Sequence, residues 1–535
     1  MKADVAILGG GLAGLTLAIQ LKQRLPTLDI LVLERNTHPV PEATHKVGES
    51  SVEIAAEYFA SVLGLKPHLT ECQLPKFGFR FFFSDRRLDF DQVTELGPSR
   101  HLAVPSYQID RGIFENFLGK QARELGVRFL DAAVVSRVDV ASAGTTHRIA
   151  FAWRGSPQEV ECDWLIDASG RAQILKRRLG LQRPNGHNAN AVWFRIGAKV
   201  DIDEWSQDDA WRTRCQPRAR WLSTNHLVGD GYWVWLIPLA SGSHSVGIVA
   251  DARLHPLRTM NSFARAMQWL TVHQPRLAQD LKSKQDLLQD FAFFKDFSYG
   301  CSQVFSSDRW AITGEAGIFL DPFYSPGSDF IAISNTFITD LIAKDTAGIA
   351  FAPYARLFER MYFSFYDNML PLYQDQYRIL GDPRVLPVKV LWDYTFYWGV
   401  LCQLFYQRRL TDLAALGDLP ADLGKGTELN IAVQRLLRVW SLVSVRSNRP
   451  VMLDQAKLAW FAALNRSMLD QLDAAALSAR IRSSVAQLRV LAVEILQAAL
   501  ADDPSIDARE LQTLLQQPAD QTPAAPTRLL FAHTV

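Results

Sequence analysis

The chain has 535 residues, enough for two or three domains with a large core. Hydrophobic residues make up 48% and charged residues 21%, which is an ordinary globular balance. The net charge of +1 argues against a dedicated nucleic-acid-binding protein. Five scattered cysteines without a C-x-x-C pair favour reduced thiols and a cytoplasmic location. No signal peptide, transmembrane segment or metal-binding pattern is predicted.

The first fourteen residues predict a strand, a glycine turn and a helix. The apolar run at residues 5–8 leads into Gly9, Gly11 and Gly14, in the pattern G-x-G-x-x-G, and a helix is expected over 15–25. The first glycine permits a tight turn, and the second lets a pyrophosphate approach the backbone. The third lets the helix pack closely on the strand. This arrangement is typical of a dinucleotide-binding unit.

A second predicted strand, residues 30–33, ends in Glu34, twenty residues after Gly14. An acidic side chain at this spacing can hold the two hydroxyls of a ribose. We therefore favour a dinucleotide site, with Leu12 and Ala13 at the phosphates and Arg35 beside Glu34, over a glycine turn in an ordinary α/β unit. The chain has no second fingerprint of this kind, so no nicotinamide site is predicted.

Further candidates for cofactor contacts lie at helix starts and strand ends. Gly48, Glu49 and Ser50 precede a helix expected over 52–63, which Ser50 or Ser51 is predicted to cap. Small residues there can approach a flavin edge, although a simple capped helix explains the composition equally well. The other candidates in this class are Arg111, Asp167, Gly314, Glu315 and Gly327.

Lys76 stands before an aromatic strand at residues 79–83. Apolar surroundings lower the pKa of a lysine and make it a proton donor or a nucleophile. The residues alone favour the other interpretation, a solvated lysine in front of a buried strand.

In the β-rich segment 191–250, Trp233 and Trp235 are two residues apart on a predicted strand and should share one face. They form either a wall of a site or part of a core.

The second half of the chain adds another helix start and a helical region. A helix is expected over 330–343 after a glycine-containing turn, which gives a second potential anion site. We predict an FAD-binding domain over 1–350, with its β-rich, substrate-side portion at about 191–250. A mostly helical C-terminal region is predicted over 351–535, with a mobile tail after 518.

In motif order, these segments resemble the FAD-binding monooxygenases and, more closely, the flavin-dependent halogenases (the tryptophan-halogenase-like family). The resemblance is carried by Gly48-Glu49-Ser50, Lys76-x-Gly78, Trp233-x-Trp235-x-Ile237-Pro238, Asp110-Arg111 with Phe114, and Asp321-Pro322 before a Ser-x-Gly turn. It implies an α/β fold with a Rossmann-like FAD-binding domain, an inserted, mainly antiparallel sheet and a helical C-terminal region.

The resemblance also implies an activity. In such enzymes reduced FAD and O2 oxidise a halide to hypohalous acid, which reaches a lysine beside the substrate. Lys76 matches that lysine, either as a hydrogen-bond donor or as a haloamine. Trp233, Trp235, Ile237 and Pro238 match the segment that separates substrate from flavin. The implied partners are a separate flavin reductase and an electron-rich aromatic substrate, either free or presented by an acyl or peptidyl carrier protein.

The sequence departs from the family at the expected halide site. The family uses the N–H groups of a Ser/Thr-Gly pair, and here the pair is Pro326-Gly327. Proline has no N–H, and a lost hydrogen bond to a charged group costs about 1.5–3 kcal/mol, or about ten- to a hundredfold in affinity. Asp329 adds negative charge nearby, whereas Ser325 and Ser328 are candidate replacement donors.

Tyr324 occupies the place of a catalytic glutamate in tryptophan-type members and is the second catalytic candidate. These departures leave two alternatives to a halogenase. One is a halide-independent monooxygenase or dehydrogenase on the same scaffold. The other is a flavoprotein that binds a carrier protein or an assembly through its helical region and has little chemistry of its own.

Overall fold

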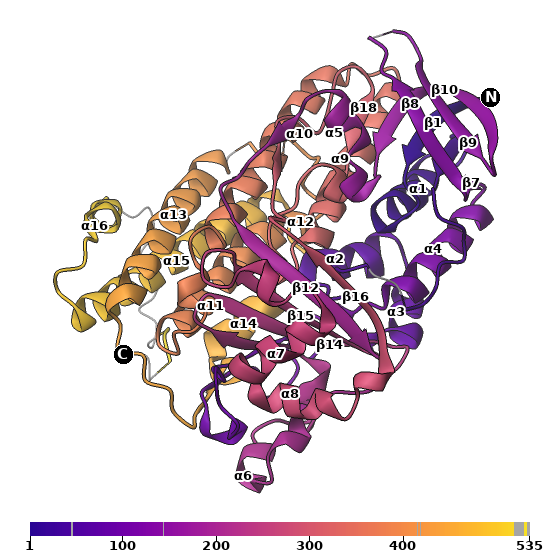
Figure 1. Cartoon of the computed structure of the whole chain (residues 1–535). Helices are drawn as coiled ribbons and strands as arrows, with labels where there is room; N and C mark the ends of the chain where they lie inside the picture. The colour runs from indigo at the N-terminus through magenta and orange to yellow at the C-terminus, as the bar shows by residue number, and fades with distance from the viewer. Residues whose placement is uncertain (44–45, 143, 415, 418, 518–528, 532–535) are drawn as a thin grey trace. The chain divides into compact units, whose positions relative to one another are not determined.

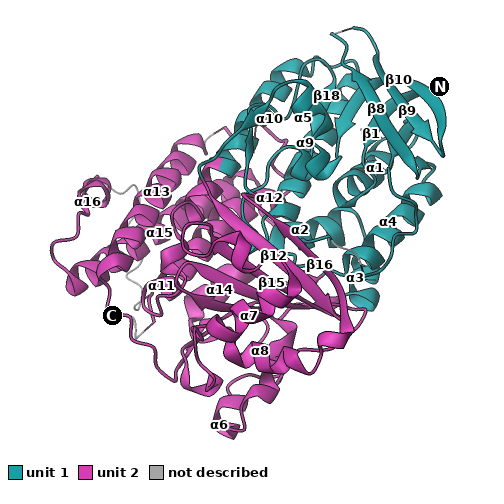
Figure 2. Ribbon diagram, viewed as in Figure 1, with its two compact units in different colours: residues 1–73, 109–186, 298–366 teal, residues 74–108, 187–297, 367–535 magenta. Residues whose placement is uncertain are grey.

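The computed structural model describes residues 1–43, 46–142, 144–414, 416–417, 419–517 and 529–531. The chain forms two compact units, and each unit combines three segments of sequence (Figure 2). Unit 1 comprises residues 1–73, 109–186 and 298–366, and unit 2 comprises residues 74–108, 187–297 and 367–535. Most of the tail predicted after 518 lies outside the described residues.

Among its described residues, unit 1 contains a seven-stranded sheet in the order β7-β2-β1-β10-β9-β8, with β18 also paired to β10. The strands are β1 (Lys2–Leu8), β2 (Ile30–Leu33), β7 (Arg128–Leu130), β8 (Ala133–Asp139), β9 (His147–Trp153), β10 (Ser156–Asp167) and β18 (Trp310–Ile312). Five of them pair in parallel, and β8 and β9 pair antiparallel. All four residues of β2 are buried, as expected for a parallel strand with both faces covered. The sheet confirms the predicted Rossmann-like half.

Three helices of unit 1 differ from their predicted bounds. Helix α1 (Leu12–Arg24) begins three residues early, directly after the glycine turn. The helix expected over 52–63 is α2 (Glu53–Glu57) followed by a π-helical turn, η1 (Tyr58–Val62). Helix α9 (Gly327–Thr346) also begins three residues early, because Pro326 takes the N-cap position with a backbone already suited to a helix.

The remaining helices and short strands of unit 1 are α3 (Lys66–Cys72), α4 (Arg111–Glu124), η3 (Gly170–Ala172), α5 (Ile174–Arg178), β11 (Gln182–Arg183), β17 (Gly300–Cys301), η8 (Gly314–Ala316) and η9 (Pro322–Tyr324). Helix α10 (Ala352–Met369) begins in unit 1 and continues into unit 2. Helix α4 has Asp110 at its N-cap position, and Gly126 follows its end with a φ of +82°.

Unit 2 contains an eight-stranded sheet among its described residues, in the order β16-β12-β15-β14-β13-β4-β5-β19. The strands are β4 (Phe79–Phe82), β5 (Glu95–Gly97), β12 (Ala189–Ile196), β13 (Thr224–Gly229), β14 (Tyr232–Pro238), β15 (His244–Asp251), β16 (Leu288–Phe294) and β19 (Met452–Asp454). All neighbours pair antiparallel except β13 with β4 and β5 with β19. The predicted antiparallel sheet is therefore present, and the C-terminal region adds a strand to it. A separate two-stranded pair joins β3 (Leu74–Pro75), which comes before β4 in the chain, to β6 (Tyr107–Gln108), which comes after β5.

The two faces of this sheet have different neighbours. Val234, Leu236 and Ile248 belong to a core that includes Trp269 and Leu270 of α7 (Phe263–His273) and Leu277 of α8 (Pro275–Lys282). Helices α7 and α8 are separated at Pro275, which is the first residue of α8. Because side chains alternate along a strand, Trp233 and Trp235 lie on the opposite face, as predicted.

The C-terminal part of unit 2 is largely helical. Its helices are α11 (Val385–Phe396), the π-helical turn η12 (Tyr397–Leu401), α12 (Cys402–Tyr406), α13 (Pro420–Val443), α14 (Ala459–Ser467), α15 (Ala474–Asp502) and α16 (Arg509–Gln516). Helices α13 and α15 pack side by side (Figure 1). Among the described helices, only α15 is long and apolar enough to cross a membrane, and 44% of the relevant window is buried, so this is weak evidence for a span.

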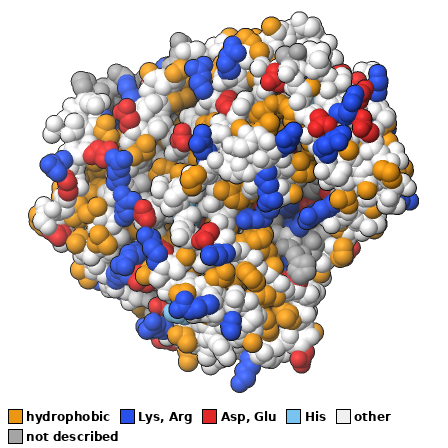
Figure 3. All heavy atoms as spheres, turned by 45° about the horizontal axis from the view of Figure 1, so that its top comes forward, with side chains coloured by type: hydrophobic (Ala, Val, Ile, Leu, Met, Phe, Trp, Pro, Cys, Tyr) orange, Lys and Arg blue, Asp and Glu red, His pale blue; other side chains and the backbone are white. Residues whose placement is uncertain are grey.

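The surface shown in Figure 3 carries basic and acidic side chains interspersed with apolar ones. This mixture agrees with the formal net charge of +1.

Candidate functional site

The glycine turn between β1 and α1 has the geometry that its three glycines suggest. Gly9 has a φ of +111°, and a Cβ on it would lie 2.4 Å from the Ala168 carbonyl oxygen. A Cβ on Gly14 would lie 2.0 Å from the Gly9 carbonyl oxygen. By contrast, the nearest atom of the described residues to a Cβ on Gly11, apart from its chain neighbours, would be Lys46 Nζ at 3.8 Å. The backbone at Gly11 is therefore open to a ligand, whereas the other two glycines are required by packing.

Glu34 is held against this turn. Its carboxylate accepts hydrogen bonds from the N–H groups of Gly10 at 2.7 Å and Asn36 at 2.8 Å, and the residue is buried. Each oxygen keeps a lone pair for a further donor such as a ribose hydroxyl. Arg35, the neighbouring candidate, is exposed.

A charged triad, made of Lys46, Arg111 and Glu115, borders the open side of Gly11. The Glu115 carboxylate is fully buried and forms ion pairs with Lys46 and, at 2.5 Å, with Arg111. Burial by itself raises the pKa of Glu115, but the two cations outweigh it and hold that pKa below its usual value. A Cβ placed on Gly11 would lie 3.8 Å from Lys46 Nζ. Lys46 and Arg111 thus put positive charge beside the open backbone of Gly11, which is the charge that a phosphate group requires.

Sequence reasoning singled out Arg111 but missed Lys46 and Glu115. The available signal was the spacing of Arg111 and Glu115, which places them on one side of α4, one turn apart. Arg111 also donates to the Val47 carbonyl oxygen at 2.6 Å, which fixes the chain just before Gly48. Gly48 has a φ of +89°, and a Cβ on it would lie 2.9 Å from the Arg111 guanidinium.

The other candidates at strand ends have distinct local roles. Gly314, with a φ of +61°, begins η8 so close to α1 that its built Cβ lies 3.0 Å from Ala13 Cβ. Burial raises the pKa of the adjacent Glu315 despite nearby cations. Asp167 is fully buried and accepts from the N–H groups of Ser169 and Leu175 at 3.0 and 2.7 Å. Its carboxylate thus shapes the turn after β10. Glu49 and Ser50 are also buried.

Ser50 and Ser51 do not cap α2, contrary to the prediction. Val52 is the N-cap residue, and no side chain at that position makes a capping bond. The Ala55 N–H in the first turn of α2 donates instead to Asp329 Oδ1 at 2.9 Å. The carboxylate that we expected to oppose an anion at α9 is therefore an acceptor for α2. A cap from 274 positions away cannot be recognised in a local pattern.

The start of α9 retains donors in spite of Pro326. Pro326 is the N-cap residue, and its carbonyl oxygen accepts from the Phe330 N–H at 3.1 Å. The N–H groups of Gly327 and Ser328 have no acceptor within the part of the chain that the structure describes. Ser325 precedes them in a left-handed conformation, with a φ of +54°. Tyr324 is buried, and its ring centroid lies 4.7 Å from that of Phe323.

In unit 2, Lys76 is buried rather than solvated. Only 5% of the residue is exposed, and its Nζ lies 3.5 Å from the centroid of the Phe79 ring. Its backbone N–H donates to the Ser106 carbonyl oxygen at 2.9 Å, and the next N–H donates to the Leu222 carbonyl oxygen at 3.0 Å. Segments distant in sequence thus enclose this lysine, which overturns the interpretation favoured by the residues alone.

Lys76 adjoins an aromatic face of the unit 2 sheet, made of Phe79, Phe81, His226, Trp233 and Trp235. The His226 ring centroid lies 5.3 Å from that of Phe79, 4.6 Å from that of Phe81 and 5.2 Å from that of Trp233. The ring centroids of Trp233 and Trp235 are 5.7 Å apart. Ile237 and Pro238 complete β14 and are buried. The residue at position 247 must be a glycine, because its built Cβ would lie 2.1 Å from the Trp235 ring.

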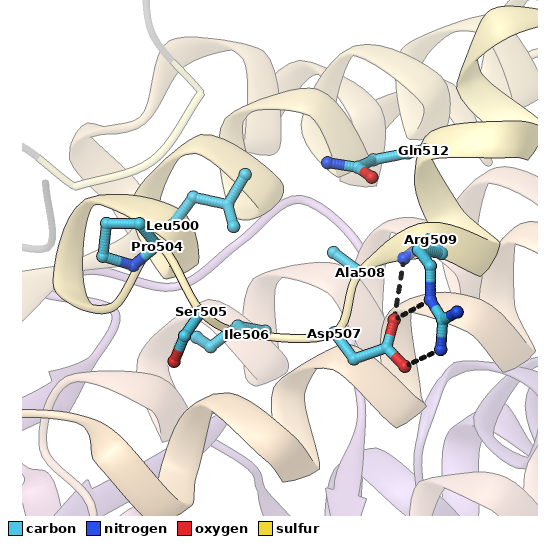
Figure 4. Close-up of a pocket in the computed structure, with 8 residues that line it drawn as sticks. All are labelled: Leu500, Pro504, Ser505, Ile506, Asp507, Ala508, Arg509 and Gln512. Atoms are coloured by element: carbon cyan, nitrogen blue, oxygen red, sulfur yellow. Dashed lines mark hydrogen bonds and ion pairs between the residues drawn. The ribbon is translucent and has the colours of Figure 1, made fainter.

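A separate pocket of about 540 Å³ lies where α15 leads into α16 (Figure 4). Its lining residues are Leu500, Pro504, Ser505, Ile506, Asp507, Ala508, Arg509 and Gln512. Asp507 and Arg509 pair with each other at 2.7 Å, and none of the predicted site residues lines this pocket.

Within the described ranges, no group of three His, Cys, Asp or Glu side chains is suited to hold a metal ion.

Comparison with known proteins supports the interpretation of unit 1 as part of an FAD-binding protein. A family model described as an FAD binding domain matches residues 2–247. The chain is 25% identical over 475 residues to a flavin-dependent halogenase of Dictyostelium discoideum, covering 80% of this chain and 77% of that protein. It is 25% identical over 343 residues to a 1H-pyrrole-2-carbonyl-[peptidyl-carrier protein] chlorinase of Pseudomonas fluorescens, covering 61% and 72%. The crystal structure of halogenase PltM superposes with a TM-score of 0.66 at 17% identity, covering 96% of this chain and 99% of that one, which shows a shared fold.

Proposed function

We propose that this FAD-dependent oxidoreductase, which carries an FAD-binding domain and is related to the flavin-dependent halogenases, halogenates an electron-rich aromatic compound in secondary metabolism. The observation that carries the proposal is the burial of Lys76 beside an aromatic face. A structural lysine before a strand would extend its ammonium into water. A lysine is rarely buried, and a buried ammonium over an aromatic ring supports a role for Lys76 in the reaction.

The residues of unit 1 fit FAD. The open backbone at Gly11 and the cations Lys46 and Arg111 suit the diphosphate, and Glu34 suits the ribose. When bound and reduced, FAD would supply two electrons and two protons, with which O2, the halide and one further proton would become hypohalous acid and water. A separate flavin reductase would deliver the reduced FAD.

Lys76 then controls where the halogen goes. Its ammonium donates a hydrogen bond to the oxygen of hypohalous acid, or its neutral amine takes the halogen as a haloamine with loss of water. The aromatic carbon takes the halogen, and the displaced ring proton leaves with the hydroxide as water or returns to the amine. The side chains of Trp233 and Trp235 keep the substrate in place and exclude water.

The substrate class is proposed from the relatives. One relative is named for a pyrrole carried by a peptidyl carrier protein, and a crystal structure of halogenase PltM contains phloroglucinol and FAD. We propose an electron-rich ring for this chain, either free or carrier-bound, and a cytoplasmic location. Tyr324 is the proposed second catalytic residue.

The halide site separates this proposal from its alternative, a halide-independent monooxygenase or dehydrogenase. Pro326 favours the alternative because it removes one expected donor. Two features of α9 support halide use: the Gly327 and Ser328 N–H groups at its start, and the engagement of Asp329 with α2. Pro326→Thr would restore the donor. A lower halide concentration for half-maximal activity, by about tenfold, is the expected result.

The decisive experiment needs no substrate. The purified protein is supplied with FAD, a generic flavin reductase, NADH, O2 and either bromide or chloride, and hypohalous acid is trapped with a reactive dione. Halide-dependent trapping above a protein-free control is expected. Peroxide release without halide dependence would instead establish the alternative. In the same assay, Lys76→Ala should keep FAD binding and oxidant production but lose transfer to any aromatic acceptor.

A further inference from the structure

A buried lysine of unit 1, Lys176, takes no part in the proposed reaction. It lies on the short helix α5, is 1% exposed, and its ammonium donates a hydrogen bond to the Gly317 carbonyl oxygen at 2.7 Å. The same ammonium lies 4.0 Å from the centroid of the Tyr299 ring. Within the described ranges, no carboxylate lies within ion-pair distance of it. Lysines are almost never fully buried without such a partner, so the position of this one needs an explanation.

The segments on both sides of the ammonium are anchored independently. Asp167, at the end of β10, accepts from the Leu175 N–H at 2.7 Å and so fixes the first turn of α5. Tyr299 is fixed by its backbone, which exchanges two hydrogen bonds with Phe319 at 2.9 and 3.0 Å. The Lys176 side chain is therefore held between two defined segments.

The acceptor of Lys176 belongs to the turn η8. Gly317 is the C-cap residue of this turn, and its N–H donates to the Gly314 carbonyl oxygen at 3.0 Å. The Tyr299 hydroxyl donates to the Glu315 carbonyl oxygen of the same turn at 2.8 Å. Lys176 and Tyr299, which we call the brace, thus contact each other and hold η8 at two of its carbonyl oxygens.

The turn η8 adjoins the glycine turn between β1 and α1. A Cβ placed on Gly314 would lie 3.0 Å from Ala13 Cβ, at the start of α1. Burial raises the pKa of Glu315, and Arg111 and Lys46 are among the cations that oppose this rise. Both cations belong to the charged triad that borders the glycine turn. The brace therefore supports a turn that is a neighbour of the proposed diphosphate site.

We propose that Lys176 is a positioning residue for FAD, and that its ammonium holds η8 against the start of α1 in the conformation that accepts the cofactor. The inference rests on the FAD site of the proposed function and adds to it a residue that acts through η8. A neutral side chain at this position would leave the Gly317 carbonyl oxygen without its donor and would release one end of the turn.

Protonation of Lys176 provides a readout that packing alone does not give. Burial is the main reason that the pKa of Lys176 is lowered to about 8; Arg171 lowers it further, whereas Cys301 and Asp167 raise it. The Tyr299 hydroxyl stays neutral in this range, because burial raises its pKa. The brace is therefore charged below about pH 8 and neutral above it. FAD affinity should fall as the pH rises through this value.

The test is equilibrium dialysis of the full-length protein against oxidised FAD at pH 7 and pH 9. If one group with a pKa of about 8 must be protonated in the complex, the affinity can fall by at most about tenfold over this interval. The wild type should lose about three- to tenfold. Lys176→Met should bind FAD about tenfold more weakly at pH 7 and show no further loss at pH 9.

Two other variants separate Lys176 from its surroundings. Lys344→Met is the matched control, because Lys344 also lies over a tyrosine, 4.5 Å from the Tyr354 ring centroid, but pairs with Asp340 at 2.8 Å near the end of α9. It should bind FAD as the wild type does at both pH values. Glu315→Gln removes the carboxyl of η8 whose pKa is raised, and it should keep the wild-type pH dependence.

Equal pH dependence in Lys176→Met and wild type overturns the proposal, as does a pH dependence that Glu315→Gln or Lys344→Met abolishes. A wild type without any pH dependence also overturns it, because Lys176 then acts through packing alone. If Lys176→Met does not fold, Lys176→Arg decides. The guanidinium stays charged at both pH values, so this variant should bind FAD equally at pH 7 and pH 9, and a wild-type pH dependence in it overturns the proposal.

These measurements involve no halide, reductase or aromatic substrate. Failure of the brace therefore leaves halide-dependent trapping of hypohalous acid unaffected, and the two failures are distinguishable. A wild type that binds no FAD at either pH would refute the FAD site on which both proposals rest.

Discussion

Each unit buries one carboxylate between two cations, and the two clusters differ in what surrounds them. In unit 2, Glu95 pairs with Arg80 at 2.5 Å and with Arg220 at 2.8 Å, and all three side chains are 0% exposed. In unit 1, Glu115 pairs with Arg111 and Lys46, whose side chains are 13% and 32% exposed.

The remaining donors of the two clusters also differ. Arg80 donates to the Pro98 carbonyl oxygen at 2.6 Å, and Arg220 donates to Asp203 at 2.7 Å. Both guanidinium groups of unit 2 are therefore hydrogen-bonded to acceptors within the protein. The cations of unit 1 lie at the open backbone of Gly11. The comparison teaches that the same charge pattern is used up within the fold where it is enclosed, and we propose that it prepares an anion site where one cation reaches water.

Glu95→Gln should produce the largest effect. It leaves two buried guanidinium groups without their carboxylate, which typically costs about 3–5 kcal/mol of folding free energy. Glu115→Gln should cost less, because water can hydrate Lys46. Denaturant unfolding of both variants measures the difference, and equal losses would mean that exposure does not distinguish the clusters.

Gly14→Ala should cost about 3 kcal/mol of stability and abolish FAD retention, because the new methyl group would overlap the Gly9 carbonyl oxygen. Gly11→Ala is the matched control. Apart from its chain neighbours, its methyl group would meet no atom of the described residues closer than 3.8 Å, so folding should survive while FAD binding weakens. Thermal unfolding and flavin absorbance are the measurements. An unstable Gly11→Ala would show that the turn is closed by packing.

His244 gives a pH dependence in unit 2. Its side chain is buried, its Nδ1 accepts from the Val200 N–H at 3.2 Å, and burial with nearby Lys284 and Lys199 lowers its pKa to about 3. The unfolded chain takes up this proton near pH 6.5, so stability is complete above that pH and falls toward pH 3. The loss is about 1.4 kcal/mol per pH unit.

The measurement is the stability of wild type and His244→Gln at pH 6.5 and 4.5. The variant should lose about 2.3 kcal/mol less over this interval, because the unfolded imidazole is already half protonated at pH 6.5. Parallel pH profiles would exclude a buried neutral imidazole.

Lys46→Met should produce the smallest effect and the most specific one. Loss of one cation at the diphosphate should weaken FAD binding about tenfold, with little change in stability because Lys46 is partly exposed. Riboflavin, which lacks the phosphates, should bind the variant and the wild type equally. Lys120→Met, on the exposed side of α4, is the control. A parallel loss for riboflavin would place Lys46 away from the diphosphate.

The predictable parts of this protein depend on local rules. The glycine spacing predicted strand, turn and helix, because φ angles and close approach are set by adjacent residues. The alternation of Trp233 and Trp235 predicted their shared face for the same reason. The start of α9 was predicted three residues late, because Pro326 was considered for its missing N–H and not for its suitability as an N-cap.

The sequence by itself determined the dinucleotide turn, the acid that follows it and the aromatic strand, since each depends on residues within one or two elements. Only the tertiary structure decided that Lys76 is buried, that Glu115 gathers Lys46 and Arg111, and that Asp329 caps α2. Burial and charge pairing depend on segments far apart in the sequence, and a one-dimensional pattern does not state which segments meet.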